Sequence, residues 1–236
     1  MDRTASAWNP VPAIVGDRLA RRALLVLVAL DFAFIVLHGV RGLLGGVDGP
    51  LPDYRLRIDI DGGFAEIFNY LKLAAITVLC LAVWRRGRHA APLLWGLVFL
   101  FALADDALSL HEDIGNMLVA PLGLPAVLGL RPNDLGELIV WAAPGVLLLV
   151  PLAYVTWRTP PKARRFSQRL VVLLAALVFF AVVVDMVHIM VVHWSRYVNG
   201  MLSLIEDGGE MVVVSAVCAY LVAAYRAPPA GDPPGR

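Results

Sequence analysis

The sequence predicts an all-α protein: a polytopic membrane helical bundle of six transmembrane helices with both termini in the cytoplasm. Three observations support this fold class: the composition, six apolar stretches of bilayer length, and the distribution of basic residues. Hydrophobic residues make up 59% of the 236 residues, and the mean hydropathy is +0.74. Such a composition leaves too little polar surface to cover a water-soluble particle of this size. We therefore expect an integral membrane protein.

Six apolar windows are long enough to cross the hydrocarbon core, which takes about 20 helical residues. They are residues 22–43, 64–84, 91–110, 135–157, 170–194 and 203–225. No small-residue cleavage motif follows the first window, so we interpret it as an anchor and not as a signal peptide. We expect residues 1–226 to form a single six-helix domain and residues 227–236, APPAGDPPGR, to be a disordered tail.

The basic residues predict the orientation, because cytoplasmic loops retain Lys and Arg. Most of them lie in the N-terminal tail, the second-to-third loop, the fourth-to-fifth loop and the C-terminal tail. This distribution places both termini in the cytoplasm. The preference for Arg over Lys, with abundant Ala, Gly, Pro and Val, is typical of GC-rich bacterial genomes. We expect a multi-pass protein of the bacterial inner (plasma) membrane.

The acidic residues are sorted in the opposite way. Only Asp2, Asp17 and Asp232 fall on the cytoplasmic side of the predicted spans. At a rise of about 1.5 Å per residue, polar residues of all six spans lie at similar depths below the external face. This polar layer contains His38, Glu66, Asp105, Asp106, His111, Glu112, Glu137, Asp185, His188, His193, Glu206, Asp207 and Glu210.

A second polar level lies deeper in the membrane. Asp31 and Lys72 are at comparable depths in the first two spans. Because an isolated charge in the bilayer is costly, intramembrane ionisable residues usually pair with one another. We expect a buried ion pair between these two helices.

Helical periodicity predicts which polar side chains share a face, since residues three, four and seven apart are neighbours. Asp105 and Glu112 are seven apart in the third span, and Asp185 and His188 are three apart in the fifth. Carboxylates and imidazoles gathered in a low dielectric repel or stay protonated unless a cation joins them, and a divalent metal is the commonest solution. The oxygen and nitrogen ligands favour zinc, iron or manganese. The expected metal ligands are His38, Glu66, Asp105, His111, Glu112, Asp185, His188 and Glu210, and the expected catalytic residues are Asp105, Glu112 and Glu210.

Each polar residue also has a structural interpretation. A carboxylate in the first turn of a helix complements the helix dipole without any ligand. This interpretation applies to Glu66, Glu137 and Glu206, while Asp113, Asp134 and His193 are expected to be interfacial or capping residues. The pair Gly208 and Gly209 is expected to allow close helix approach.

Two long segments join spans on the predicted external side. Residues 45–63 include YRLRIDID, whose alternation is typical of a short strand or an interfacial strip. Residues 115–133 are apolar but interrupted by Pro and Gly. We expect this second segment to be a re-entrant or surface-lying cap over the polar layer.

Two short motifs carry a family resemblance: ALADDALSLHEDIG at residues 102–115 and SLIEDGGEMV at residues 203–212. The sequence resembles a group of uncharacterised multi-pass bacterial membrane proteins. They have an Asp-Glu then His-Glu pattern on one helix and a Glu-Glu then Glu pattern on the last. Here Asp106 and Asp207 stand where glutamate is usual, which keeps the charge and shortens the reach.

This resemblance implies a six-helix membrane protein with His111, Glu112 and Glu210 at matching positions, and it implies no activity. A resemblance to the ceramidase-like membrane metallohydrolases is looser, because the spaced histidines of their last helix are missing.

We expect a metal-dependent membrane enzyme, a hydrolase or oxidase, that acts on a lipid-soluble substrate through a metal-activated water. One alternative is a proton or divalent-cation transporter or channel, although the inner halves of the spans contain few polar residues. Another is a haem protein with axial ligands among His38, His111, His188 and His193, although many carboxylates around a haem are unexpected. Membrane lipid is the expected partner, and no basic stripe predicts nucleic-acid binding.

Overall fold

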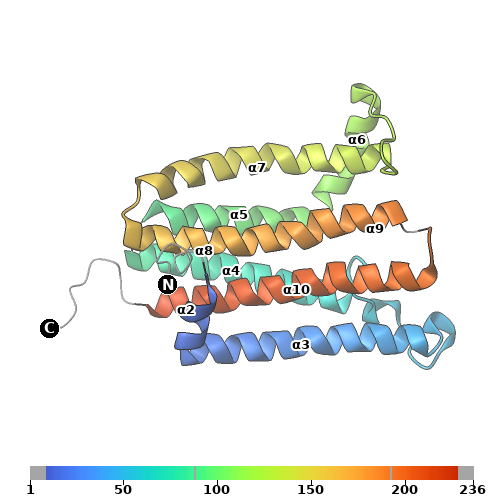
Figure 1. Ribbon diagram of the computed structural model, residues 1–236, viewed down its shortest axis with the longest axis horizontal. Helices are drawn as coiled ribbons and strands as arrows, with labels where there is room; N and C mark the ends of the chain where they lie inside the picture. Colours follow the sequence, from blue (N-terminus) through green and yellow to red (C-terminus); the bar gives the residue numbers. More distant parts are fainter. Residues whose placement is uncertain (1–8, 88, 192, 228–236) are drawn as a thin grey trace. The chain divides into compact units, whose positions relative to one another are not determined.

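The computed structural model describes residues 9–87, 89–191 and 193–227, which are almost entirely helical (Figure 1). The elements in chain order are α2 (Val11–Gly16), α3 (Arg18–Leu43), the short turns η1 (Gly46–Asp48) and η2 (Tyr54–Leu56), α4 (Phe64–Gly87), α5 (Ala90–Ala107), α6 (Leu110–Leu122), α7 (Pro132–Arg158), α8 (Pro161–Val178), the π-helical η3 (Phe179–Val184), α9 (Asp185–Val191) and α10 (Arg196–Arg226).

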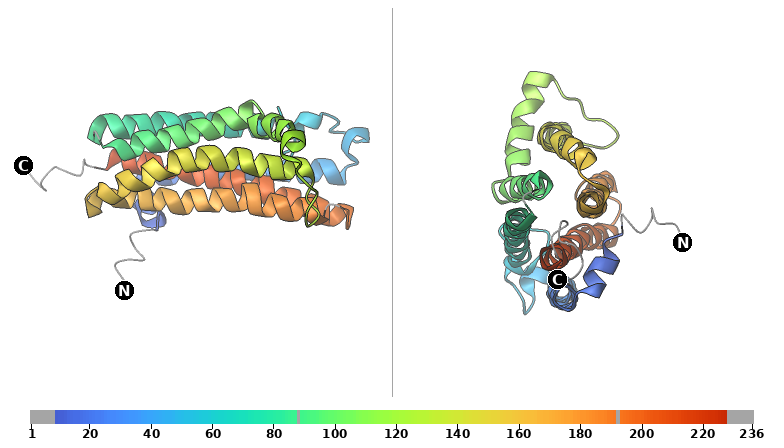
Figure 2. Two further views of the ribbon diagram at one scale, coloured as in Figure 1. Left: turned by 90° about the horizontal axis from the view of Figure 1, so that it is seen from above. Right: turned by 90° about the vertical axis from the view of Figure 1, so that its left-hand side faces the viewer.

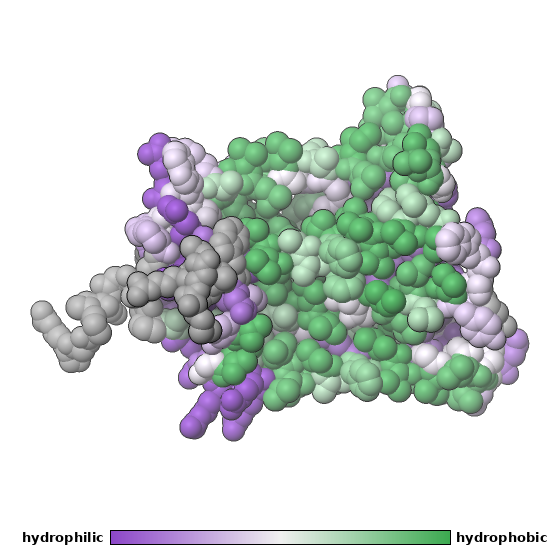
Figure 3. All heavy atoms as spheres, viewed as in Figure 1, coloured by the Kyte–Doolittle hydropathy of each residue, from purple (hydrophilic) through white to green (hydrophobic). Residues whose placement is uncertain are grey.

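Six helical stretches in the described part of the chain are long and apolar enough to cross a membrane, and each overlaps one of the six predicted windows. They are residues 18–43, 64–87, 90–107, 132–158, 163–191 and 197–226. The middle of these helices is hydrophobic and their ends are hydrophilic (Figure 3). Only 6% of the most apolar window of α3, and of α7, is buried within the protein. Exposed apolar surface on that scale indicates a multi-pass membrane protein.

The chain divides into two compact units. Among the described residues, the middle unit consists of Leu73–Leu170 with Asn9 and residues 224–227, and the flanking unit consists of Pro10–Lys72 and Val171–Ala223. Helices α4 and α8, and the last turn of α10, therefore divide between the two units. Residues 228–236, nearly all of the tail expected to be disordered, lie outside the described part of the chain.

In the middle unit, α5 and α7 pack together and α6 crosses α7 near its first turns (Figures 1 and 2). Helix α6 has 13 residues, which is too short to span a bilayer. It occupies the start of the segment expected to form a re-entrant or surface-lying cap. Helix α7 starts with Pro132 and is capped by Asp134, whose Oδ2 accepts the N–H of Arg131 at 2.6 Å. The capping role expected for Asp134 is confirmed.

In the flanking unit, α3, the start of α4 and α10 share a hydrophobic core. Its buried centre is formed by Ile58, Ala65 and Met211. Helix α10 passes close to its neighbours, since a Cβ atom on Gly208 would lie 2.9 Å from Ile35 and one on Gly209 would lie 2.3 Å from Phe180. The close approach expected at these two glycines is confirmed.

Residues 45–63, before α4, do not form the short strand that was one of the two structures expected for them. Tyr54–Leu56 is a 3₁₀ turn, and no strand occurs at residues 45–63 among those described. The side chain of Asp53 caps this turn by accepting the N–H of Arg55 at 2.9 Å. A local side-chain hydrogen bond of this kind competes with strand formation.

Candidate functional site

The third predicted span ends earlier than expected, and its end creates an acid and imidazole pair. Helix α5 stops at Ala107, and Ser109 adopts a left-handed conformation with φ of 47° before α6 starts at Leu110. This turn brings the ring of His111 back to the last turns of α5. The Nδ1 atom of His111 lies 2.8 Å from Oδ2 of Asp105.

The predicted shared face of Asp105 and Glu112 is therefore wrong. A seven-residue spacing aligns two side chains only along an uninterrupted helix, and Ser109 interrupts it. Glu112 is exposed in the first turn of α6. The sequence contained a signal for the break, because Ser109 and Glu112 form the S-x-x-E pattern that often starts a helix.

Asp105 and His111 differ in exposure. The side chain of Asp105 is 1% exposed, whereas that of His111 is 24% exposed. The hydrogen bond with Asp105 raises the pKa of His111, burial opposes the rise, and the charges of Asp105, Glu137 and Glu112 add to it. A neutral ring that donates from Nδ1 keeps a lone pair on Nε2. This arrangement can accept a proton or bind a metal.

The second carboxylate oxygen of Asp105 is unusual. Its Oδ1 atom is buried and has no hydrogen-bond partner among the described residues. An unsatisfied buried acceptor costs about 1–3 kcal/mol. Such an atom in a native protein calls for an explanation, such as a bound ion, a water or a catalytic role.

A tight helix crossing positions α6 and its His111 against α7. A Cβ atom on Gly115 would lie 2.7 Å from the backbone nitrogen of Glu137, and one on Gly136 would lie 2.3 Å from the carbonyl oxygen of Gly115. The crossing therefore requires glycine on both helices. It brings the His111 ring to within 6.2 Å of the ring of Trp141, measured between centroids.

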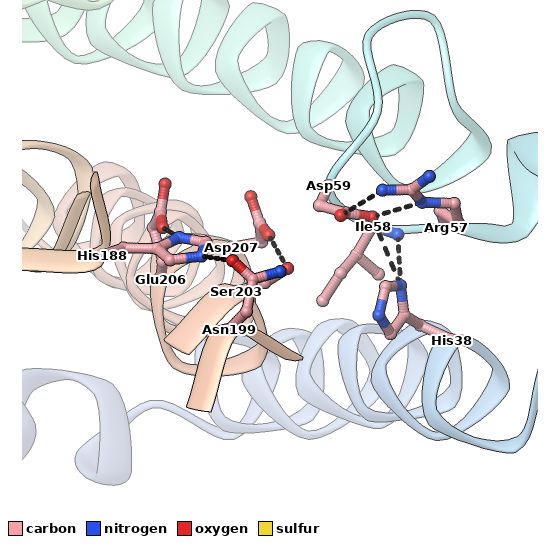
Figure 4. Close-up of polar contacts among 9 residues, drawn as sticks. All are labelled: His38, Arg57, Ile58, Asp59, His188, Asn199, Ser203, Glu206 and Asp207. Atoms are coloured by element: carbon pink, nitrogen blue, oxygen red, sulfur yellow. Dashed lines mark hydrogen bonds and ion pairs between the residues drawn. The ribbon is translucent and has the colours of Figure 1, made fainter. Parts of the chain in front are cut away.

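The flanking unit contains a second group of polar contacts (Figure 4). The Nδ1 atom of His188 lies 2.7 Å from Oε2 of Glu206, and its Nε2 atom lies 2.9 Å from Oδ1 of Asn199. Both ring nitrogens of His188 therefore have an oxygen partner, which leaves neither of them available to a metal. In this arrangement His188 joins α9 to α10.

His38 also has close protein partners. Its Nδ1 atom accepts the N–H of Ile58 at 3.1 Å and lies 3.6 Å from Oδ1 of Asp59. Arg57 donates to both oxygens of Asp59, at 2.9 and 2.6 Å. Sequence reasoning did not find Asp59 or Arg57, because the loop that carries them shows no helical periodicity.

The deeper level of the flanking unit contains the expected ion pair. Lys72 Nζ donates to Oδ1 of Asp31 at 2.8 Å, and both side chains are at most 2% exposed. Lys72 also donates to the carbonyl oxygen of Met211 at 2.8 Å, and Ser215 Oγ donates to Oδ2 of Asp31 at 2.5 Å. The predicted ion pair is confirmed.

The remaining predicted ligands lie in the flanking unit. Glu66 accepts the N–H of Gly62 and the hydroxyl of Tyr70, so both of its carboxylate oxygens have protein partners. Asp185 starts α9 and Glu210 lies within α10, and both are half-buried. Among the described residues, no three or more His, Cys, Asp or Glu side chains form a group that could hold a metal ion.

Comparison with other proteins identifies a family. No curated protein matches the sequence, and no solved structure matches it. Residues 59–224 match DUF8692, a domain of unknown function. This match covers Asp105, His111 and most of the flanking-unit contacts, whereas Asp31 and His38 precede it. Because the match spans well over half of the chain, the protein belongs to the DUF8692 family, which agrees with the expected uncharacterised family.

Proposed function

We propose that this protein is a membrane hydrolase in which His111, oriented by Asp105, is the general base. One observation carries the proposal: a fully buried carboxylate holds Nδ1 of a partly exposed imidazole at 2.8 Å. A carboxylate in this position fixes the orientation and tautomer of the ring and stabilises the charged form that follows proton uptake. The substrate is a lipid-soluble ester or amide.

The reaction follows from the two ring nitrogens of His111. Nε2 removes a proton from water as the water oxygen bonds to the substrate carbonyl carbon. The same proton is then donated to the leaving oxygen or nitrogen as its bond to that carbon breaks. The negative charges near His111 favour the protonated ring between the two steps.

A divalent metal is a second candidate, favoured by the unpartnered Oδ1 atom of Asp105. Zinc, iron or manganese bound there would supply an activated water next to the same imidazole. Both candidates need Asp105 and His111, and they differ in the metal content of the protein.

The test uses the full chain purified in detergent. Hydrolysis of fatty-acyl esters and amides in mixed micelles should fall about 10²- to 10⁴-fold in His111→Gln and Asp105→Asn. Asp113→Asn, an exposed carboxylate of the same helix α6, is the matched control and should keep wild-type activity. Wild-type hydrolysis by His111→Gln would refute the proposed base.

Two measurements need no substrate. In an NMR titration, the pKa of His111 should fall in Asp105→Asn, because the hydrogen bond to a carboxylate is the main cause of its rise. Elemental analysis decides between the candidates, since a stoichiometric metal lost in Asp105→Asn selects the metal-activated water. A haem absorption band would contradict both.

A further inference from the structure

The flanking unit contains a cavity at the ends of α3 and α10. Its volume is about 230 Å³, below the roughly 300 Å³ at which pockets for drug-sized ligands begin. It therefore fits an ion or a small polar group. The charged and polar lining residues are His38, Arg41, Arg57, Asp59, Asn199 and Ser203.

Arg41 gives this cavity an uncompensated positive charge. The residue is 6% exposed. Its Nε atom donates to the carbonyl oxygen of Asp53 at 3.1 Å, and one terminal nitrogen donates to that of Pro52 at 3.4 Å. Among the described residues no carboxylate pairs with it. A buried cation with only neutral partners is costly, and a bound anion would offset that cost.

The other side chains present mainly donors to the cavity. Because Nδ1 of His38 accepts the N–H of Ile58, the neutral ring carries its proton on Nε2. Because Oδ1 of Asn199 accepts from His188, its two amide hydrogens are left for another acceptor. Asp59 is neutralised by two hydrogen bonds from Arg57. Ser203 donates to Asp207 at 3.1 Å and is therefore not counted as a donor.

We propose that this cavity binds a phosphate group. Its donors come from separate elements: Arg41 and His38 from α3, and Asn199 from the first turn of α10. Donors from several directions suit a tetrahedral oxyanion, and Arg is the preferred residue for phosphate recognition. The group belongs either to a phospholipid head or to free phosphate. Arg41 and Asn199 lie at ends of candidate spans, the level at which lipid head groups occur.

Binding to the delipidated full chain in detergent tests this site. Inorganic phosphate is titrated by calorimetry, and phosphatidylglycerol is titrated in mixed micelles by native mass spectrometry. Diacylglycerol, which lacks the phosphate, is the control ligand. Saturable binding of phosphatidylglycerol alone identifies a lipid head group, and saturable binding of inorganic phosphate identifies the free ion. If neither binds, the proposal is wrong.

Two variants locate the binding. Asn199→Asp keeps the size and the acceptor for His188 but adds a negative charge to the cavity, and Arg41→Gln removes the buried cation. Each should weaken binding about tenfold or more, since a hydrogen bond to a charged group contributes about 1.5–3 kcal/mol.

The controls are Arg55→Gln, at an exposed residue outside the lining, and Asn116→Asp on the exposed face of α6. Both should bind as wild type. If Arg41→Gln fails to fold, Asn199→Asp still decides. Unchanged binding by Asn199→Asp would overturn the proposal.

Discussion

Two aspartates, one in each unit, are equally buried and differently bonded. Asp31 and Asp105 are both 0% exposed. Both oxygens of Asp31 accept hydrogen bonds, one from Lys72 and one from Ser215. Asp105 uses one oxygen for His111, and its other oxygen has no partner among the described residues.

This difference separates a structural carboxylate from a functional one. Burial and charge are alike at the two positions, so neither property distinguishes them. The Lys72 ammonium has three donors, and its partners Asp31, Met211 and Ser215 use all of them. Lys72 therefore has no donor available for a ligand. The incomplete bonding of Asp105, beside a partly exposed imidazole, leaves capacity for a substrate, water or ion.

The largest expected effect on stability comes from removing one partner of the Asp31–Lys72 ion pair. Asp31→Ala leaves the Lys72 charge buried and unpaired, so we expect the free energy of unfolding to fall by about 3–5 kcal/mol. Combining Asp31→Leu with Lys72→Met should recover most of this loss, because an apolar pair needs no partner. Denaturant unfolding in mixed micelles, followed by tryptophan fluorescence, measures both.

The comparison predicts a smaller loss of stability for Asp105→Asn, because that position already has one unpaired oxygen. Equal losses of stability at Asp31 and Asp105 would contradict the assignment of one as structural and the other as functional.

Sequence reasoning succeeded where one-dimensional signals determine the structure. Hydropathy alone located the six candidate spans, and depth along two helices predicted the pairing of Asp31 with Lys72. The Asp134 cap was predictable because capping is local.

The errors arose where the chain departs from regular α-helix. Ser109 has a left-handed backbone conformation that ends the helix. As a result His111, and not Glu112, lies next to Asp105. The partners of His38 come from a loop whose position depends on contacts distant in sequence. The π-helical turn at Phe179–Val184 within the fifth span has no hydropathy signal. The metal, the lipid-soluble substrate and the membrane orientation stay predictions.

The next largest effect concerns the glycine crossing that positions His111. In Gly136→Ala the new methyl group would meet the carbonyl oxygen of Gly115 at 2.3 Å. Backbone cannot move aside as a side chain can, so we expect a loss of about 1–3 kcal/mol and a shifted NMR signal of His111. Gly145→Ala, in the same helix with nothing within 4 Å, is the matched control.

Gly145→Ala should be neutral or stabilising by up to about 1 kcal/mol, because Ala has the higher helix propensity. If Gly136→Ala is equally harmless, the α6 and α7 crossing does not depend on glycine. The position of His111 would then need another explanation.

The smallest expected effect is a pH dependence of opposite sign in the two units. The hydrogen bond that the His111 ring donates to Asp105 raises the pKa of His111. Its stabilisation is therefore present below the ordinary histidine pKa of about 6.5 and lost as pH rises through the folded value. Burial raises the pKa of Asp59, but the hydrogen bond and charge of Arg57 outweigh it, so the pKa lies below its ordinary value. That stabilisation is present above about pH 4 and is lost as pH falls.

Unfolding free energies of wild type, His111→Gln and Arg57→Gln measured across this pH range separate the two contributions. The difference in free energy of unfolding between wild type and His111→Gln should become smaller as pH rises above neutrality. The difference between wild type and Arg57→Gln should become smaller as pH falls. Each difference should be about 1 kcal/mol or less, as is usual for partly exposed pairs. If the difference between wild type and His111→Gln grows with pH instead, folding lowers the pKa of His111. Asp105 would then not stabilise the charged ring, which the proposed general base requires.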